Sequence, residues 1–333
     1  MGEGIRREIV LDPSVIPPLD ESLLRLSEEE RDFLHRAITP DDEELRKRIV
    51  EVQRTAYEKH AYPCIRAFHF VNLMMSSNSI YPTVLEAGKS GNTIFLDLGC
   101  CMGTDVRKLV LDGYPPQNVL GSDIRQDFID LSHHLYQDSA TNSIRFFTSD
   151  IFEVDPHPSS LITKSPDVTV VDTSQITTLE QLRGRIDHFY TGALFHLFDE
   201  KTQYALALRI ASLLKREPGS VVFGRHVGLA SPGLIDDHMK RERFGHSPSS
   251  WKSLWQQVFT ELESTEFAES RVVVEASFQG EFDNKVIPKT SNQPSLLLFW
   301  SNFKSRESGC GEVKKIEMEY SESKNEDRWT TLQ

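Results

Sequence analysis

The chain has 333 residues, of which 38% are hydrophobic, enough for one large domain or for a core with a cap. Its 50 acidic residues outnumber its 37 basic residues, and the net charge of -13 disfavours a protein that grips the phosphate backbone of nucleic acid. No run approaches the roughly 18 apolar residues of a membrane span, and early charges such as Glu3 and Arg6 argue against a signal peptide. We expect a cytoplasmic protein.

The first ninety residues show helical patterns. Ser27 and Glu30 have the spacing of a capping box, and a longer helix is predicted after Thr39-Pro40. Its apolar positions share one face: Leu45, Ile49, Val52 and Ala56. We expect residues 1–90 to form a helical cap that lies across the edge of a sheet and closes a pocket over a cofactor.

An apolar strand runs from Ile94 and ends in a turn that contains Asp97, Gly99 and Gly103. Glycines at a strand exit let the backbone pass close to a ligand, where a Cβ atom would collide. The helix predicted from about Asp105 would then point its N-terminus at that ligand. This arrangement indicates a nucleotide cofactor.

Two further predicted strands also end in an acid, at Asp123 and at Asp150. Together with Asp97 they would place three carboxylates along the C-terminal edge of a parallel sheet, the edge where open α/β folds bind ligands. A single aspartate at such a position is more often a helix cap or a solvated loop residue. Three in register favour a ligand site.

The turn lacks the middle glycine of the dinucleotide-binding motif, and this indicates the class of cofactor. A dinucleotide fold normally shows Gly-x-Gly-x-x-Gly, but Cys101 occupies the middle position, which should compromise the tight turn, and Asp97 would repel a pyrophosphate. S-adenosylmethionine carries a cationic sulfonium and an ammonium group, which an acid attracts. We therefore predict a class I methyltransferase with a Rossmann-like, doubly wound, mostly parallel seven-stranded sheet.

The four cysteines signal neither a disulfide framework nor a zinc site, and we expect no bound metal.

The methyltransferase domain is predicted over residues 91–303, with a flexible polar tail over 304–333. For the fourth strand we choose Ile186–Tyr190 over Asp167–Asp172, which becomes an extra strand or insertion. The other elements expected after it are a helix at Lys201–Leu214, a fifth strand at Ser220–Gly224, a loop at Gly228–His246, a helix from Ser247-Pro248, and a hairpin of Val272–Ala276 with Leu296–Trp300.

Several motifs together resemble the fungal meroterpenoid-pathway methyltransferases, from about Tyr62 to Val274. They are Leu96-Asp97-Leu98-Gly99-Cys100-Cys101, Gly121-Ser122-Asp123, Ser149-Asp150-Ile151-Phe152, Phe195-His196-Leu197-Phe198-Asp199 and Gly224-Arg225-His226-Val227-Gly228. The resemblance implies S-adenosylmethionine-dependent esterification of the carboxyl group of a farnesylated aromatic polyketide acid, of the farnesyl-dimethylorsellinic acid type. Gly245-His246-Ser247 departs from the Arg-His-Asn that the family usually shows, and the stretch 156–185 is longer than usual.

The motifs assign the cofactor site. Asp97, Gly99 and Gly103 would line the methionine and ribose side, and Asp123 with its neighbour Ile124 would hold the ribose and the adjoining part of the cofactor. Asp150 and Ile151 would hold the adenine. Arg66 could pair with the methionine carboxylate, or could be an ordinary exposed helix arginine.

For the substrate, His196 and Arg225 or His226 would orient the carboxylate, although a lone histidine in an aromatic helix is more often a core residue. The aromatic residues Phe68, Phe70, Trp251 and Trp255 could wall an apolar pocket for a prenyl chain, or could be plain core. An aryl carboxylic acid, with a pKa of about 4, is already ionised at neutral pH, so it needs no base, whereas a phenol with a pKa near 10 would.

Three other functions stay open. The first is an O-methyltransferase that acts on a phenolic hydroxyl of another small metabolite. The second is a nicotinamide-dependent oxidoreductase, which the missing middle glycine argues against. The third is a methyltransferase-like regulator without turnover. Homodimerisation through the helical cap is also conceivable from this pattern.

Overall fold

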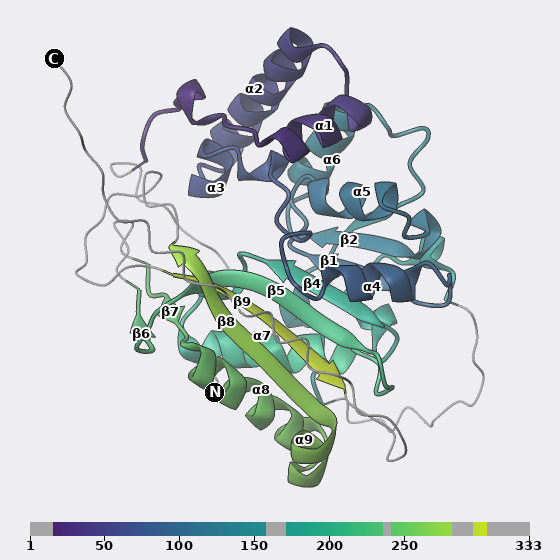
Figure 1. Cartoon of the computed structure of the whole chain (residues 1–333), viewed down its shortest axis with the longest axis vertical. Helices are drawn as coiled ribbons and strands as arrows, with labels where there is room; N and C mark the ends of the chain where they lie inside the picture. The colour runs from purple at the N-terminus through teal and green to yellow at the C-terminus, as the bar shows by residue number, and fades with distance from the viewer. Residues whose placement is uncertain (1–15, 158–170, 236–240, 282–295, 305–333) are drawn as a thin grey trace, which may run out of the picture.

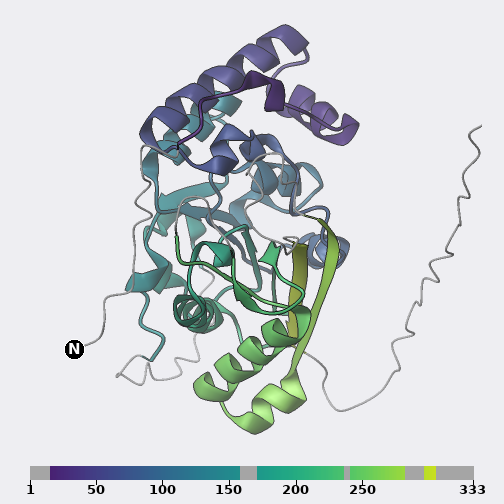
Figure 2. The same cartoon turned by 90° about the vertical axis from the view of Figure 1, so that its left-hand side faces the viewer.

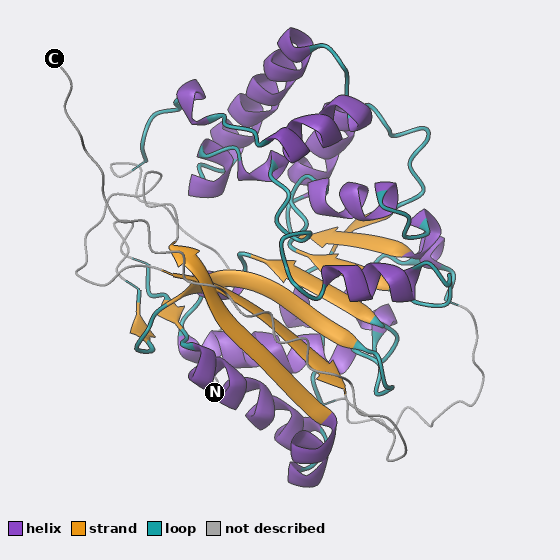
Figure 3. Ribbon diagram, in the orientation of Figure 1, coloured by secondary structure: helices purple, strands orange, loops and turns teal. Residues whose placement is uncertain are grey.

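The computed structural model describes residues 16–157, 171–235, 241–281 and 296–304. Its centre is a seven-stranded sheet in the order β3-β2-β1-β4-β5-β9-β8 (Figures 1 and 3). Strands β1 to β5 are parallel to one another, and β9 is antiparallel to both β5 and β8. The strands are β1 (Phe95–Leu98), β2 (Val119–Asp123), β3 (Arg145–Thr148), β4 (His188–Gly192), β5 (Val221–Gly228), β8 (Val272–Glu281) and β9 (Leu296–Lys304). This sheet confirms the predicted class I methyltransferase fold.

Helices cover both faces of the sheet. In Figures 1 and 2, α4 and α7 lie on opposite sides of it. The helices are α1 (Glu28–Ala37), α2 (Asp42–Lys59), α3 (Pro63–Arg66), α4 (Tyr81–Gly88), α5 (Thr104–Leu111), α6 (Gln126–Tyr136), α7 (Glu200–Leu213), α8 (Pro248–Leu262) and α9 (Thr265–Arg271). None of the helices in the described ranges is long and apolar enough to cross a membrane.

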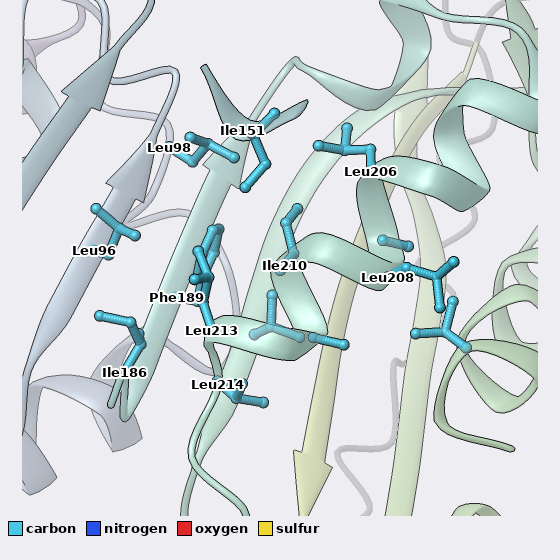
Figure 4. Packing of buried hydrophobic residues seen from close by; sticks show 14 of the residues in the cluster. Leu96, Leu98, Ile151, Ile186, Phe189, Leu206, Leu208, Ile210, Leu213 and Leu214 are labelled. Carbon is cyan, nitrogen blue, oxygen red and sulfur yellow. The ribbon is translucent and has the colours of Figure 1, made fainter. Parts of the chain in front are cut away.

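Alternation along the strands decides which helix each residue meets. Leu96 and Leu98 point to the face covered by α7, where they join Phe189, Leu206 and Ile210 in one buried cluster (Figure 4). The intervening positions of β1 point to the opposite face, where Phe95 packs in a second cluster with residues of α4 and α5. The backbone of β1 is therefore fixed from both sides, and the turn that follows it has a rigid base.

The N-terminal helices pack in a different place from the one we expected. Their buried side chains, including Leu34 and Ile49, form a cluster with Phe128 and Leu135 of α6. The long helices α1 and α2 therefore cover α6 and do not lie across the sheet edge. The reason is an apolar stripe on α6 that the sequence pattern did not pair with them. α3 and the residues after it approach the edge where the strands end (Figure 1), and the same cluster includes Met102 of the turn after β1.

Two strand predictions can be judged in detail. The choice of the segment around Ile186–Tyr190 as the fourth strand is confirmed by β4, whereas most of the rejected segment, like the predicted tail beyond Lys304, lies outside the described residues. The predicted end of the fifth strand at Gly224 was wrong. Because β9 pairs with β5 as far as Gly228, Arg225 and His226 belong to a strand and not to a loop.

Candidate active site

The turn after β1 is built from left-handed backbone. Gly99 has φ 78, Cys101 has φ 51 and Gly103 has φ 62. We expected Cys101 to compromise the tight turn, and this was wrong, because the cysteine adopts the left-handed conformation itself. Such a conformation costs a non-glycine residue about 1 to 2 kcal/mol, so the surrounding contacts must hold it in place.

The glycines of this region differ in how much space surrounds them. A Cβ atom on Gly99 would have only a Leu194 methyl at 4.0 Å, so its open side can admit a ligand close to the backbone. A Cβ atom on Gly103 would lie 2.6 Å from the ring of Phe146, and one on Gly121 would lie 2.7 Å from the same ring. Gly99 is thus free for a cofactor, whereas Gly103 and Gly121 make room for one aromatic ring.

The carboxylate of Asp123 joins the end of β2 to this turn. One of its oxygens accepts the backbone N–H of Cys101 at 2.9 Å, and the other accepts that of Arg125 at 2.9 Å. Burial raises the pKa of Asp123, and these hydrogen bonds together with the charge of Arg125 act against the rise. Each carboxylate oxygen has a second lone pair, so Asp123 can also accept from a ribose hydroxyl.

Asp97 is the unusual acid of the site. Its side chain is 3% exposed, and no described residue donates a hydrogen bond or a salt bridge to it. Burial and the nearby charges of Asp105 and Asp123 raise its pKa well above the usual range. A buried carboxylate without a partner costs stability, unless a bound cation supplies the missing charge.

Asp105, in the first turn of α5, holds the chain segment that precedes α4. Its Oδ1 accepts the backbone N–H groups of Met74 and Met75, each at 2.9 Å. Burial raises its pKa to about 6, although these bonds and the charge of Arg225 oppose the shift. Residues 74 and 75 are thereby fixed beside the glycine turn and the end of β5.

The residues predicted for adenine lie in two settings. Asp150 caps the short helix η5 (Ile151–Glu153) by accepting the N–H of Phe152 at 2.8 Å. Ile151 is only 7% exposed and packs between Leu98 and Leu206, so its side chain is core and offers an adenine ring little surface (Figure 4). Ile124 is 54% exposed directly after Asp123, which makes it the available apolar contact.

Arg66 is engaged elsewhere. Its Nε donates to the carbonyl of Pro18 at 2.7 Å, so the side chain is bound to the N-terminal segment, and its pairing with a methionine carboxylate stays a prediction. Cys64, on the same helix α3, has an exposed thiol and lies within electrostatic reach of Asp123 and Arg241. This helix therefore borders the site from the side opposite β5.

Two of the three residues predicted for the substrate carboxylate point to opposite faces of the sheet. Arg225 and His226 are consecutive in β5 and point to opposite faces of the sheet. The Nη2 of Arg225 lies 2.6 Å from the sulfur of Met74, whereas His226 is fully surrounded by aromatic rings, with Trp251 at a centroid distance of 4.4 Å. His196, in η8 (Phe195–Leu197), is buried, and its Nδ1 accepts the N–H of Val227 at 3.4 Å.

All of these histidines are held neutral. Burial, followed by the charges of Arg243, His226, Arg241 and Arg225, lowers the pKa of His196 well below its usual value. Burial and the neighbouring His246 do the same for His226. The sequence analysis missed Arg241 and Arg243, because they belong to a charged stretch that looked like a solvated loop. Only the fold brings them to His196.

The aromatic residues predicted to wall one pocket lie in two separate clusters. Phe68 and Phe70 pack with the N-terminal helices, and Trp251 and Trp255 pack between α8 and the sheet. All four are at most 5% exposed. They are core residues, and the prediction of a shared prenyl wall was wrong, because aromatic identity alone does not say which core a residue enters.

The chain is similar to known fungal methyltransferases. Residues 19–71 match the family described as the meroterpenoid methyltransferase N-terminal domain. The Asnovolin E/Chermesin D methyltransferase nvfJ of Aspergillus novofumigatus is 31% identical over 240 residues, which cover 72% of this chain and 79% of that protein. The chain belongs to the meroterpenoid methyltransferase family. Membership confirms the resemblance to the meroterpenoid-pathway methyltransferases.

Two further relatives and one solved structure are also similar to the chain. Methyltransferase trt5 of Aspergillus terreus is 33% identical, over 63% of this chain and 68% of that protein. O-methyltransferase phiE of a fungal species is 33% identical, over 64% of this chain and 65% of that protein, just under two thirds of its length. A solved phosphoethanolamine methyltransferase 2 of Haemonchus contortus aligns over 85% of this chain and 61% of its own, with 11% identity and a TM-score of 0.46.

This meroterpenoid methyltransferase has no group of three or more metal-binding side chains within the part of the chain that the structure describes. The candidate site has an acidic side, at Asp97, Asp105 and Asp123, and a basic side, at Arg225, Arg241 and Arg243. His196 lies on the basic side. The two sides are connected by Met74, which is held by Asp105 and contacts Arg225.

Proposed function

We propose that this protein transfers the methyl group of S-adenosylmethionine to the carboxylate of a prenylated aromatic polyketide acid in meroterpenoid biosynthesis. The cofactor, when bound, supplies an electrophilic methyl group on a cationic sulfur. The product is the neutral methyl ester. The observation that carries the proposal is the pairing of an acidic side with a basic side at one edge of the sheet.

The residues of the acidic side fit the cofactor. The buried Asp97 carboxylate has no cationic or hydrogen-bonding partner among the described residues, and a donor with a sulfonium and an ammonium group would supply the missing positive charge. The free side of Gly99 admits a ligand close to the backbone. Asp123 has spare lone pairs for ribose hydroxyls, and Ile124 offers exposed apolar surface beside it.

The histidines support an acceptor that arrives ionised. Because the N–H of Val227 donates to Nδ1 of His196, the proton of this neutral ring is on Nε2. In the same way Trp300 Nε1–H donates to Nδ1 of His226 at 3.0 Å. Both rings can then donate a hydrogen bond from Nε2, but neither has a free nitrogen on that side to take a proton from a phenol. A carboxylate needs no such base.

Within this proposal the chain supplies position and desolvation. Fixing donor and acceptor at near-attack distance can be worth about 7 to 11 kcal/mol of the barrier. The segment of Met74 and Met75 is held by Asp105, and Met74 also contacts Arg225, so these side chains would help to exclude water from the reacting groups. Cytoplasmic location and homodimerisation stay predictions.

The proposal is tested by incubating the enzyme with methyl-labelled S-adenosylmethionine and a farnesylated dimethylorsellinic acid. We expect a labelled product whose label is released as methanol by mild alkali, which cleaves esters. A labelled product that resists alkali would place the methyl group on a phenolic oxygen and support the alternative acceptor. Failure to bind the donor, with binding of a nicotinamide dinucleotide, would contradict the cofactor as well.

A further inference from the structure

We infer that Arg225, Arg241 and Arg243 form the binding site for the carboxylate of the substrate, with His196 as a hydrogen-bond donor at its centre. This inference rests on the proposed carboxylate acceptor and names the residues that would select it. None of the motifs singled out Arg241 or Arg243.

The backbone brings the arginines to His196. The loop that carries His196 begins at Ala193, whose N–H donates to the carbonyl of Arg225 at 2.7 Å. It ends at Phe198, whose carbonyl accepts the N–H of Phe244, the neighbour of Arg243, at 3.0 Å. One end of the loop is therefore hydrogen-bonded to Arg225, and the other end is hydrogen-bonded to the residue that follows Arg243.

A buried glutamine makes this arrangement rigid. Gln203 of α7 is fully buried, and its Nε2 donates to the carbonyl of Phe198 at 3.0 Å and to that of Phe244 at 2.7 Å. The β6 (Gly233–Leu234) and β7 (Phe244–Gly245) pair is extended by a bond from Ile235 N–H to the carbonyl of Arg243 at 2.8 Å. Arg243 therefore has a fixed backbone next to the loop of His196.

The local field favours an anion. The charges of all three arginines act on His196 and, after burial, help to keep it neutral. The charge of Arg241 also acts weakly on Cys64 of α3. Arg225 forms no ion pair among the described residues, and its Nε is buried without an acceptor there. An N–H of this kind, like the Nε2–H of the neutral His196, is a donor that a carboxylate can accept from.

The site would distinguish substrate from product. Methyl transfer forms a bond between the methyl carbon and a carboxylate oxygen, breaks the bond from that carbon to the sulfur, and leaves a neutral ester and a neutral thioether. The ester no longer carries the charge that the arginines attract, so it should leave readily. The same attraction stabilises the nucleophile before reaction, so the arginines should act mainly on KM and little on kcat.

The experiment measures the binding of a farnesylated dimethylorsellinic acid and of its methyl ester by quenching of tryptophan fluorescence. We expect the wild type to bind the acid at least about tenfold more tightly than the ester. Arg241→Gln and Arg243→Gln should each weaken acid binding by about tenfold, leave ester binding unchanged and raise KM more than they lower kcat. Arg243→Lys, which keeps the charge, should recover part of the loss.

The matched control is Arg145→Gln. Arg145 is a half-buried arginine at the start of β3, where its Nε donates to the carbonyl of Ile176 at 2.9 Å, and it should not alter the ratio of acid to ester affinity. Unchanged affinity for S-adenosylmethionine shows that each variant is folded, and if the buried Arg243 cannot be replaced, Arg241→Gln alone decides. Equal binding of acid and ester by the wild type would overturn this inference even if the enzyme forms a methyl ester. Absence of any methyl ester would instead overturn the proposed function.

Discussion

The carboxylate of Glu30 accepts the backbone N–H of Leu73 at 3.2 Å, while its other oxygen accepts the N–H of Ser27 at 2.8 Å. The acid that completes the capping box of α1 therefore also fastens the segment ahead of α4, and it takes a third bond from the Asn72 side chain at 2.9 Å. Residues 72–75 are held by Glu30 on one side and by Asp105 on the other.

We predict that Glu30→Ala lowers the free energy of unfolding by about 2 to 3 kcal/mol, because hydrogen bonds to a charged group are worth about 1.5 to 3 kcal/mol and several are lost. Ser27→Ala, which removes only the other half of the capping box, should cost about 1 kcal/mol. Urea unfolding of the two variants makes the comparison. Equal losses would mean that Glu30 acts only as a cap.

Asp97→Asn should weaken binding of S-adenosylmethionine by about tenfold or more, because a contact to a charged group is worth about 1.5 to 3 kcal/mol. Without ligand the same variant should unfold at a higher temperature than the wild type, because it removes a buried charge that has no partner. Calorimetric titration and thermal unfolding measure the two effects. A variant that binds the donor as tightly as the wild type would refute the role of Asp97.

Asp123→Ala should weaken the cofactor by about tenfold or more and should also lower stability by about 1 to 3 kcal/mol, because the Cys101 and Arg125 amides lose their acceptor. Asp130→Ala, at an exposed position of α6, is the matched control and should change neither quantity. An unchanged dissociation constant for Asp123→Ala would remove the ribose assignment.

His196→Ala should lower kcat/KM for the acid by about tenfold, while the dissociation constant of S-adenosylmethionine stays the same, because the lost hydrogen bond concerns the acceptor. At saturating substrates, kcat of the wild type should be flat between pH 7 and 9. The carboxylate has lost its proton well below that range, and His196, whose pKa is lowered, is neutral throughout it. A kcat that rises tenfold per pH unit would indicate a phenol as the acceptor.

Buried histidines should make the protein sensitive to acid. His188, whose Nδ1 lies 3.0 Å from the hydroxyl of Tyr114, has its pKa lowered to about 4 by burial. Its folded pKa lies below its unfolded value of about 6.5, so its contribution is complete above pH 6.5 and declines as the pH falls toward 4. From pH 7 to pH 5 the wild type should lose about 2 kcal/mol more than His188→Gln.

This difference is measured by urea unfolding at the two pH values. The exposed His134 supplies the control, because His134→Gln should lose as much stability as the wild type over the same interval. Equal losses in the wild type and His188→Gln would contradict the assigned pKa.

Much of the fold could be predicted from the sequence because the signals were local. The strand that contains Asp97 and the strand that ends at Asp123 follow from apolar runs bounded by glycine, and Ser27 with Glu30 predicted the start of α1 correctly. The end of β5 could not be predicted in this way, because it depends on pairing with β9, which lies far along the chain.

In the candidate site, too, the residues that depend on local sequence could be predicted and those that depend on long-range contacts could not. The acids at the strand ends are in the positions that strand order dictates, whereas the grouping of Arg243 with His196 depends on Gln203, whose hydrogen bonds connect segments about forty residues apart. Ile151 was assigned to a ligand because it follows Asp150, but the direction of its side chain places it in the core. Side-chain direction in a turn is not visible from spacing.

The ring of Phe146 occupies the space that side chains on Gly103 and Gly121 would need. Substitutions at these three positions, which lie on three different elements, therefore depend on one another. An alanine at either glycine is tolerable only if Phe146 is replaced by a smaller residue. At position 103 the alanine would also strain the left-handed backbone. Among homologous sequences these positions should change together, and an engineer who wishes to reshape the turn has to begin on the neighbouring strand.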